Sequence, residues 1–262
     1  MSDHTPIDQA HAAMEAAPTD DALRMRFYER LADGELFLLL SQEATGDQLS
    51  PEMFDVADGR YVLAFDRPDR LSAFAQDAAP YAALSGRVLA QMLAGQGVGL
   101  GLNLDVAPSS ILIPAPAMAW LAETVAKSPD AVEARIKTVF PPAGLPDHLI
   151  ESLDTKLATA IGRARSAYLV GVEYDGGGRG HMLGFVDAAP DAQGALAHAV
   201  GEALTFSGIE AGALDVGFFA ASDATAARLA TVGLRFDLPQ PKAPTERKAP
   251  GSDPNAPPIL RS

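Results

Sequence analysis

The stretch from Asp58 to Pro114 constrains the fold of this chain more than any other part of it. The apolar run 61–65 (YVLAF) is followed by a helix-start signal at 66–69, an amphipathic segment at 85–93 and a second apolar run, 97–104 (GVGLGLNL). Strand-like and helix-like segments that alternate within so short a stretch are typical of α/β proteins. The sequence therefore predicts an α/β (α+β) fold class, with a mixed sheet in this part of the chain.

The run 97–104 has glycine at the alternate positions 97, 99 and 101. Successive side chains of a strand point to opposite faces, so the glycines share one face and apolar side chains fill the other. A glycine face indicates that another element approaches closely, and we expect a helix to pack there, with Gly99 and Gly101 as structural residues. A nucleotide-binding loop is the alternative. That loop needs the spacing G-x-G-x-x-G between a strand and a helix, whereas here a predicted helix precedes the glycines and a strand follows them.

Acidic residues mark two helix starts. Asp66 fits an N-cap, Pro68 is tolerated in the first turn, and Asp69 follows within that turn. Asp20 or Thr19 is the corresponding cap of an earlier helix, whose apolar residues recur at a spacing of four: Leu23, Phe27 and Leu31. Between these helices, Asp58-Gly59 separates two short apolar runs and predicts a hairpin.

A second series of elements begins after the polar link at 127–130. A strand near 132–139 precedes a helix with one apolar stripe, and two strands joined by the turn DGGGRG (175–180) come next. A further helix, a strand at 214–219 and a last helix complete the series. The order β-α-β-β-α-β is the split βαβ pattern of ferredoxin-like folds. The stripe of the first helix in this series is expected to bury Leu149, Leu153, Leu157 and Ile161.

These two series predict two domains. We expect an α/β domain with a mixed sheet over 1–127 and a ferredoxin-like split βαβ domain over 128–238. Residues 239–262 are rich in proline and polar side chains. Such a segment buries too little apolar surface to offset the entropy of ordering it, so we expect a disordered tail.

The composition limits the classes of function. The formal net charge is −14 and no basic patch is evident, so nucleic-acid binding is not expected. There is no cysteine, which excludes disulfides, thiolate nucleophiles and zinc sites built on cysteine. The longest apolar run, 36–40, is far shorter than the roughly 20 residues of a membrane helix. The N-terminal segment also lacks the basic and apolar regions of a signal peptide, so we expect a cytoplasmic protein without membrane association.

The chain carries no catalytic motif, and its histidines lack metal-binding spacing, so neither a metal nor a cofactor is predicted. Five residues are candidates for binding a ligand. Arg179 and His181 flank the glycine-rich turn, where a mobile loop can meet an anion. The others are Asp66, Arg87 at the start of its helix, and Asn103 at the end of the glycine-alternating strand. Structural roles are the alternative: a cap for Asp66 and a hairpin tip for the turn.

Several hydrophobic segments match those of a known family. In order they are ELFLLL (35–40), GRYVLAFDRPDRLSAF (59–74), YAALSGRVLAQML (81–93), GVGLGLNL (97–104) and ILIP (111–114). With these segments the stretch 36–114 resembles the N-terminal domain of the bacterial SseB family. The part from about 131 to 236, with AYLVGVEY at 167–174, resembles that family's C-terminal domain. The resemblance implies no catalytic residues, because the matching segments are hydrophobic patterns rather than chemical signatures.

The leading hypothesis is therefore an SseB-like, non-catalytic cytoplasmic protein that binds a protein partner or a small metabolite. The alternative is an enzyme whose acid–base site is assembled from distant residues, namely Asp66, Arg87 and His181. A deep pocket lined by converging polar groups would favour the enzyme, and a broad apolar patch would favour protein binding. The sequence does not specify the partner or the oligomeric state.

Overall fold

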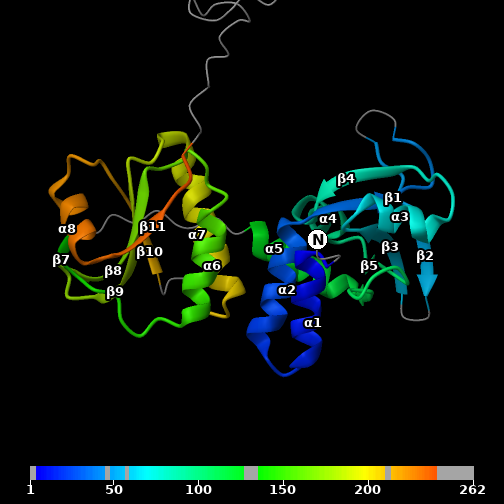
Figure 1. The fold of residues 1–262 in the computed structure, drawn as a ribbon, viewed down its shortest axis with the longest axis horizontal. Coiled ribbons are helices and arrows are strands. Elements are labelled where there is room, and N and C mark those ends of the chain that lie inside the picture. Colours follow the sequence, from blue (N-terminus) through cyan, green and yellow to red (C-terminus); the bar gives the residue numbers. More distant parts are fainter. Residues whose placement is uncertain (1–3, 45–47, 57–58, 127–134, 210–213, 241–262) are drawn as a thin grey trace, which may run out of the picture.

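The computed structural model describes residues 4–44, 48–56, 59–126, 135–209 and 214–240, and these form two mixed α/β units that lie side by side (Figure 1). All strands of one sheet precede residue 114, and all strands of the other follow residue 135. We call residues 4–126 the N-terminal half and residues 135–240 the C-terminal half. The α/β fold class predicted from the sequence is confirmed, whereas the expected domain junction at 127/128 lies outside the described residues.

The N-terminal half is built on a sheet with the strand order β4-β1-β3-β5-β6, and β2 pairs with the free part of β3. Only β3 and β5 run parallel. Helices α1, α2, α4 and α5 cover one face and α3 covers the other. The elements are α1 (Pro6–Ala16), α2 (Asp21–Asp33), β1 (Glu35–Leu39), β2 (Met53–Val56), β3 (Gly59–Phe65), α3 (Pro68–Ala75), β4 (Tyr81–Ser85), α4 (Gly86–Leu93), β5 (Val98–Leu102), β6 (Ile111–Ile113) and α5 (Ala115–Ala126).

The glycine face of β5 is packed, but not against a helix as the sequence suggested. A Cβ atom on Gly99 would lie 2.5 Å from the ring of Tyr61 and 2.6 Å from the carbonyl oxygen of Ile113. A Cβ atom on Gly101 would lie 2.5 Å from a methyl of Leu63. Tyr61 and Leu63 belong to the neighbouring strand β3, so the side chains of that strand lean across β5 and fill the space the glycines leave open.

The C-terminal half has a second sheet with the order β10-β9-β8-β11. Strand β7 pairs with the far end of β8, on the edge that β11 also uses. Helices α6 and α7 cover one face and α8 covers the other. The elements are β7 (Ile136–Phe140), α6 (Asp147–Leu157), β8 (Ser166–Tyr174), β9 (Arg179–Val186), α7 (Gln193–Phe206), β10 (Leu214–Phe219), α8 (Ala224–Val232) and β11 (Leu234–Asp237).

The ferredoxin-like arrangement expected for this half is not the one observed. A split βαβ unit inserts a strand between its two parallel strands, whereas β9 and β10 are direct parallel neighbours joined through α7. The order of elements along a chain does not fix their lateral order, and here β11, a strand that the sequence did not predict, occupies an edge of β8. The predicted stripe of α6 is buried at Leu149, Leu153 and Leu157, but Ile161 lies beyond the helix end and is 57% exposed.

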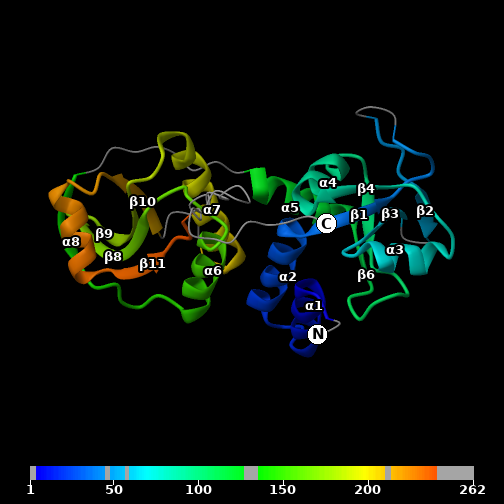
Figure 2. The same cartoon turned by 45° about the horizontal axis from the view of Figure 1, so that its top comes forward.

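The two halves meet through helices. Two views show α6 and α7 facing the N-terminal half, with α2 and α5 on the opposite side of the contact (Figures 1 and 2). Phe206 at the end of α7 joins the core of the N-terminal half, where its ring centroid is 6.4 Å from that of Trp120 on α5. The contact is therefore partly apolar, and its remainder is charged.

The described chain ends against the C-terminal half. The Gln240 amide donates a hydrogen bond to the carbonyl of Ala164, and the Gly162 amide donates one to the carbonyl of Pro239. The first two residues of the predicted tail are thus ordered, and 241–262 lie outside the described residues. Within the described part, no helix has the length and apolar character needed to cross a membrane.

Candidate functional site

A cleft between the two halves is the candidate site. Helix α2 forms one wall, and α6 with the end of α7 forms the other. We call it the inter-half cleft; it is partly open to solvent and its volume is about 60 Å³. Clefts at contacts between domains are common places for small-molecule binding. The polar side chains that line it include Arg26, Glu29, Arg30, His148, Glu151 and Ser207.

Ser207 is the most unusual group in the cleft. It caps the C-terminus of α7, where Gly208, with a φ of 69°, turns the chain out of the helix. The residue is only 6% exposed, yet its hydroxyl oxygen has no hydrogen-bond partner among the described residues. An unsatisfied buried hydroxyl is uncommon because leaving it without a partner costs about 1–3 kcal/mol. The ring of His148 donates a hydrogen bond to the main-chain carbonyl of Ser207, 3.0 Å away, so that carbonyl is satisfied.

The charged side chains of the cleft pair off, with one exception. Arg26 lies 3.7 Å from the carboxylate of Glu151, and the Glu29 carboxylate accepts a hydrogen bond from Ser152 and faces Lys156. Arg30 is half-buried, and its guanidinium has no ion pair or hydrogen bond within the described part of the chain. Among the residues that line the cleft, two arginines therefore face two glutamates, and the charges balance in number although Arg30 itself has no direct partner in the described part of the chain.

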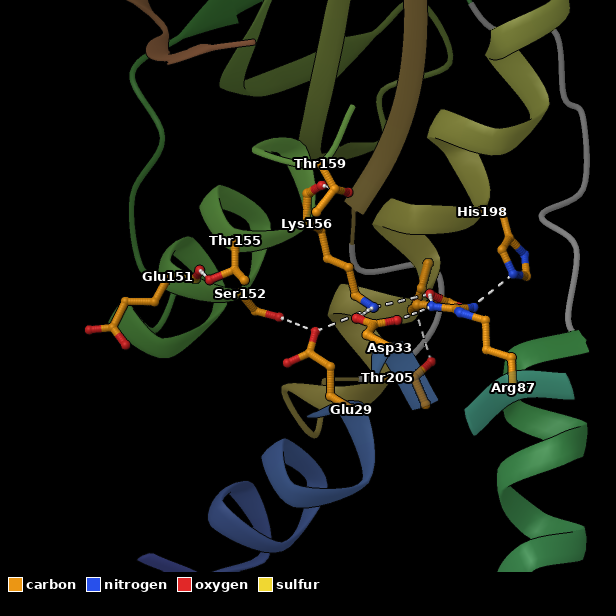
Figure 3. Close-up of polar contacts among 12 residues, drawn as sticks. Glu29, Asp33, Arg87, Glu151, Ser152, Thr155, Lys156, Thr159, His198 and Thr205 are labelled. Atoms are coloured by element: carbon orange, nitrogen blue, oxygen red, sulfur yellow. Dashed lines mark hydrogen bonds and ion pairs between the residues drawn. The ribbon is translucent and has the colours of Figure 1, made fainter. Parts of the chain in front are cut away.

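Behind the cleft, an inter-half network of charges ties the two halves together (Figure 3). The Lys156 ammonium from α6 lies 2.5 Å from Asp33 on α2 and 3.3 Å from Glu202 on α7. The Arg87 guanidinium on α4 donates to the same two carboxylates. The network comprises Glu29, Asp33, Arg87, Lys156 and Glu202, with His198 at its rim, 3.1 Å from Glu202.

The pKa values of two carboxyls report how strongly this network is coupled. Burial alone would raise the pKa of Glu202, but hydrogen bonds from Arg87 and the charge of Lys156 outweigh burial and lower it. The pKa of Asp33 is lowered in the same way, with burial opposed by Lys156 and Arg87. Both groups are therefore charged near neutral pH, and Arg87, a residue predicted to bind a ligand, is fully engaged in holding the halves together.

Two other predicted residues, Asp66 and Asn103, meet in a second network at the base of α1. Asp66 does not cap α3: the N-cap position is Arg67, without a side-chain cap, and the Asp66 carboxylate instead binds Arg70 one turn later at 2.8 Å. The Asn103 side-chain oxygen accepts from the Asp66 amide. Arg70 also binds Asp8 at 2.5 Å.

Neutral donors complete this α1 network. Ser109 donates to Asp8 and in turn accepts from the Asn103 amide group, and Thr5 donates to Asp66. The α1 network therefore comprises Thr5, Asp8, Asp66, Arg70, Asn103 and Ser109. Its carboxylates are closed off by hydrogen bonds, so Asp66 and Asn103 serve the fold.

The remaining predicted residues lie apart, at the beginning of β9. Arg179 is exposed and pairs with Glu173 on β8 at 2.8 Å. A ring nitrogen of His181 lies 3.0 Å from the carbonyl of Ala143. The five predicted residues thus fall at three separate places, and the structure does not assemble Asp66, Arg87 and His181 into one acid–base site. No cluster of three or more potential metal-ligating side chains occurs in the described ranges.

The residues of the inter-half cleft were missed from the sequence. Arg30 looks like any arginine on the polar face of an amphipathic helix, and Ser207 belongs to an ordinary helix end. The one available signal was Ser207-Gly208, because a glycine after an apolar helix marks a C-terminus with exposed polar groups. Nothing in the sequence indicates that this end faces α2.

Comparison with known proteins identifies the family of the first part of the chain. Residues 8–120 match the family model described as the SseB protein N-terminal domain. This part of the chain therefore belongs to the SseB family, as the hydrophobic segments of the sequence suggested. The match spans α1 through most of α5 and includes α2, one wall of the inter-half cleft. No curated protein and no solved structure matches the chain.

Proposed function

We propose that this protein is a non-catalytic, cytoplasmic, small-metabolite-binding protein whose ligand occupies the inter-half cleft. The observation that carries the proposal is the cleft itself, which polar and charged side chains of both halves line. Clefts at contacts between domains are common ligand sites. The guanidinium of Arg30 lines this cleft without an ion pair or hydrogen bond among the described residues, so it is available to a ligand.

The alternative of an enzyme receives less support. Its three suggested residues are each held by other parts of the fold: Asp66 by Arg70, Arg87 by Glu202, and His181 by a main-chain carbonyl. A general acid or base must reach the proton that it transfers. Groups at three separate places do not share one substrate, which is why we favour binding over catalysis.

A ligand screen with a matched pair of variants tests the proposal. We would measure the melting temperature of the full chain with each member of a panel of small anionic, neutral and cationic metabolites. We expect some compound to raise it, since a ligand that binds only the folded state stabilises that state. The variant Arg30→Gln should lose this rise. Without ligand it should be about as stable as the native chain, because Arg30 makes no ion pair among the described residues.

The control is Arg24→Gln, an arginine on the same helix that pairs with Asp21 and does not line the cleft, and it should respond to ligand like the native chain. The proposal is wrong if no compound shifts the melting temperature. It is also wrong if the compounds that do so act equally on Arg30→Gln.

A further inference from the structure

Strand β4 is an open edge of the N-terminal sheet. It stands at the end of the strand order β4-β1-β3-β5-β6, and among the described strands it pairs with β1 alone (Figure 1). Its register with β1 runs from Tyr81 to Ser85 without a bulge. An edge strand of this kind presents a row of main-chain groups with which another strand can pair.

The main-chain hydrogen bonds at the two ends of β4 show which of its residues face outward. They join Pro80 to Leu40 at one end and Gly86 to Gly34 at the other. In an antiparallel pair, residues that bond to the neighbouring strand alternate with residues whose N–H and C=O point away from it. The even-numbered residues of β4 therefore bond to β1, and the main-chain groups that point outward belong to Tyr81, Ala83 and Ser85.

This edge lacks the features that usually prevent strands from pairing. Natural proteins protect exposed edges with charged side chains, proline or a bulge. The sequence of β4, YAALS, contains neither a charge nor a proline, and its exposed residues are Tyr81, which is 50% exposed, and Ala83. The edge strand of the other sheet, β10, carries the charged residue Asp215. Of these two edges, β4 is therefore the one suited to pairing.

The distribution of charge indicates a second copy of the chain as the partner. The formal net charge is −14, so two copies repel each other unless they meet at a neutral surface. Between residues 78 and 104 the one charged side chain is Arg87, whose charge is held in ion pairs. This stretch also exposes Val88 and Met92 on α4, the helix that begins where β4 ends. It is therefore a neutral, partly apolar surface on an acidic protein.

The side chains of β4 are complementary to those of a second β4. A two-fold axis at Ala83 overlaps all five residues and brings outward-facing groups opposite outward-facing groups. Ala83 then faces Ala83 of the second copy, Tyr81 faces Ser85, and Ala82 faces Leu84. Each large side chain lies opposite a small one, so the two strands can approach without a clash on either face.

We infer that two copies of this chain pair through β4, in antiparallel register about Ala83, and so join their N-terminal sheets into one continuous sheet. The same surface is used by both copies, as in most two-fold dimers. The inference goes beyond the proposed ligand binding and does not depend on it, because β4 does not line the inter-half cleft.

Analytical ultracentrifugation of the full chain tests this pairing. We would measure the mass from about 10 μM to about 1 mM, since small interfaces dissociate in this range, and expect it to approach twice the mass of one chain. Ala83→Lys and Ala83→Glu should each weaken association roughly tenfold or more, because like charges then face each other across the axis. An equimolar mixture of the two variants should form the dimer again, since opposite charges then meet.

The control is Met53→Lys, which places the same charge on an exposed position of β2 in the same sheet and should leave the dimer intact. Disulfide formation provides a second measurement, because the native chain has no cysteine. The two Cα atoms of a directly opposed, hydrogen-bonded pair lie about 5.5 Å apart, which suits a disulfide. Oxidised Ala83→Cys should therefore give a covalent dimer, and Met53→Cys should not.

The contrary results are equally clear. A chain that stays monomeric over the whole concentration range would leave this edge to a strand of another protein, and the inference would be wrong. A dimer that persists in both Ala83→Lys and Ala83→Glu, or a mixture of the two that does not associate, would place the interface elsewhere. If circular dichroism shows that the charged variants do not fold, Ala83→Cys decides, and failure to form the covalent dimer overturns the inference.

Discussion

The α1 network and the inter-half network use the same chemistry to different ends. In the α1 network, Arg70 is shared by two carboxylates, and neutral hydroxyl and amide groups satisfy the remaining lone pairs. Its charged side chains are at most 9% exposed. In the inter-half network, two cations are shared by three carboxylates. Glu29, Lys156 and Glu202 are at most 7% exposed, while Arg87 and Asp33 remain about 30% exposed. A network sealed inside one half fixes a single chain segment, whereas a network with a water-exposed rim joins two halves, and the loss of a partner at that rim costs less.

The largest effect should come from breaking the sealed network. Arg70→Met leaves Asp8 and Asp66 facing each other, with 0% and 4% of their side chains exposed. Removing one partner of a buried ion pair costs about 3–5 kcal/mol, because the other charge stays buried without compensation. Urea denaturation should show this loss. The control is Arg24→Met, which disturbs an exposed pair with Asp21 and should cost at most about 1 kcal/mol.

Lowering the pH should also destabilise the protein through the α1 network, but by less than Arg70→Met does. Burial would raise the pKa of Asp8, but hydrogen bonds from Arg70 and Ser109 outweigh it and hold that pKa well below its usual range. The unfolded chain therefore takes up protons first as the pH falls. The stability that Asp8 contributes is complete above the pKa of an unfolded aspartate, about 4, and is lost progressively below it.

The measurement is the free energy of unfolding by urea between about pH 6 and pH 3. The native chain should lose stability steeply over the lower part of this range. Asp8→Asn, which starts less stable, should lose it less steeply because it lacks this carboxyl. The pKa values of Asp33 and Glu202 are also lowered, so some dependence with the same sign should remain. Parallel curves for the two proteins would show that the α1 network does not drive acid sensitivity.

The inter-half network should give an intermediate effect with a distinctive signature. Glu202→Gln removes the charge of one of the two carboxylates that Arg87 and Lys156 share. We expect a loss of roughly 2–3 kcal/mol, below the usual range for buried pairs because Asp33 still faces both cations. The exposed Glu151→Gln is the control and should cost less than about 1 kcal/mol.

The same variant tests whether this network couples the halves. Trp120 is the only tryptophan and belongs to the N-terminal half, so its fluorescence reports on that half, while far-UV circular dichroism reports on the whole chain. Glu202→Gln should make the two unfolding transitions separate, and Arg70→Met should leave them coincident. Transitions that stay coincident in Glu202→Gln would show that the apolar contact of Phe206 with Trp120 is sufficient to couple the halves.

The contrast between the networks also explains what the sequence could predict. Patterns that depend on neighbours in sequence were reliable: Asp20 caps α2, the hairpin of β2 and β3 forms, and β10 has the bounds expected for it. Patterns that depend on partners far along the chain were not. Asp66 has the local signature of a cap, but Arg70 takes its carboxylate as an ion-pair partner, and the distant residues Thr5 and Asn103 hydrogen-bond to it.

The strand order of the C-terminal half and the cleft could not be predicted from the sequence for the same reason. Nothing in a linear pattern states that β11 would pair with β8, or that the end of α7 would face α2. The family match at 8–120 supports the hydrophobic patterns from which it was inferred, but those patterns describe one half only. A site formed between halves depends on residues that have no distinguishing local signal, and Arg30 and Ser207 are of this kind.

The smallest effect should come from the rim of the inter-half network. Asp33→Asn removes a carboxylate that lies 2.5 Å from Lys156 but is 32% exposed, so water can replace part of what it provides. We expect a cost of about 0.5–1 kcal/mol by urea denaturation, close to that of a surface ion pair. The control is Asp21→Asn, an exposed i,i+3 partner of Arg24, which should cost a few tenths of a kcal/mol or less, about what such helix pairs contribute. A loss for Asp33→Asn as large as that for Glu202→Gln would mean that the inter-half network behaves as a sealed unit, and the distinction between it and the α1 network would not hold.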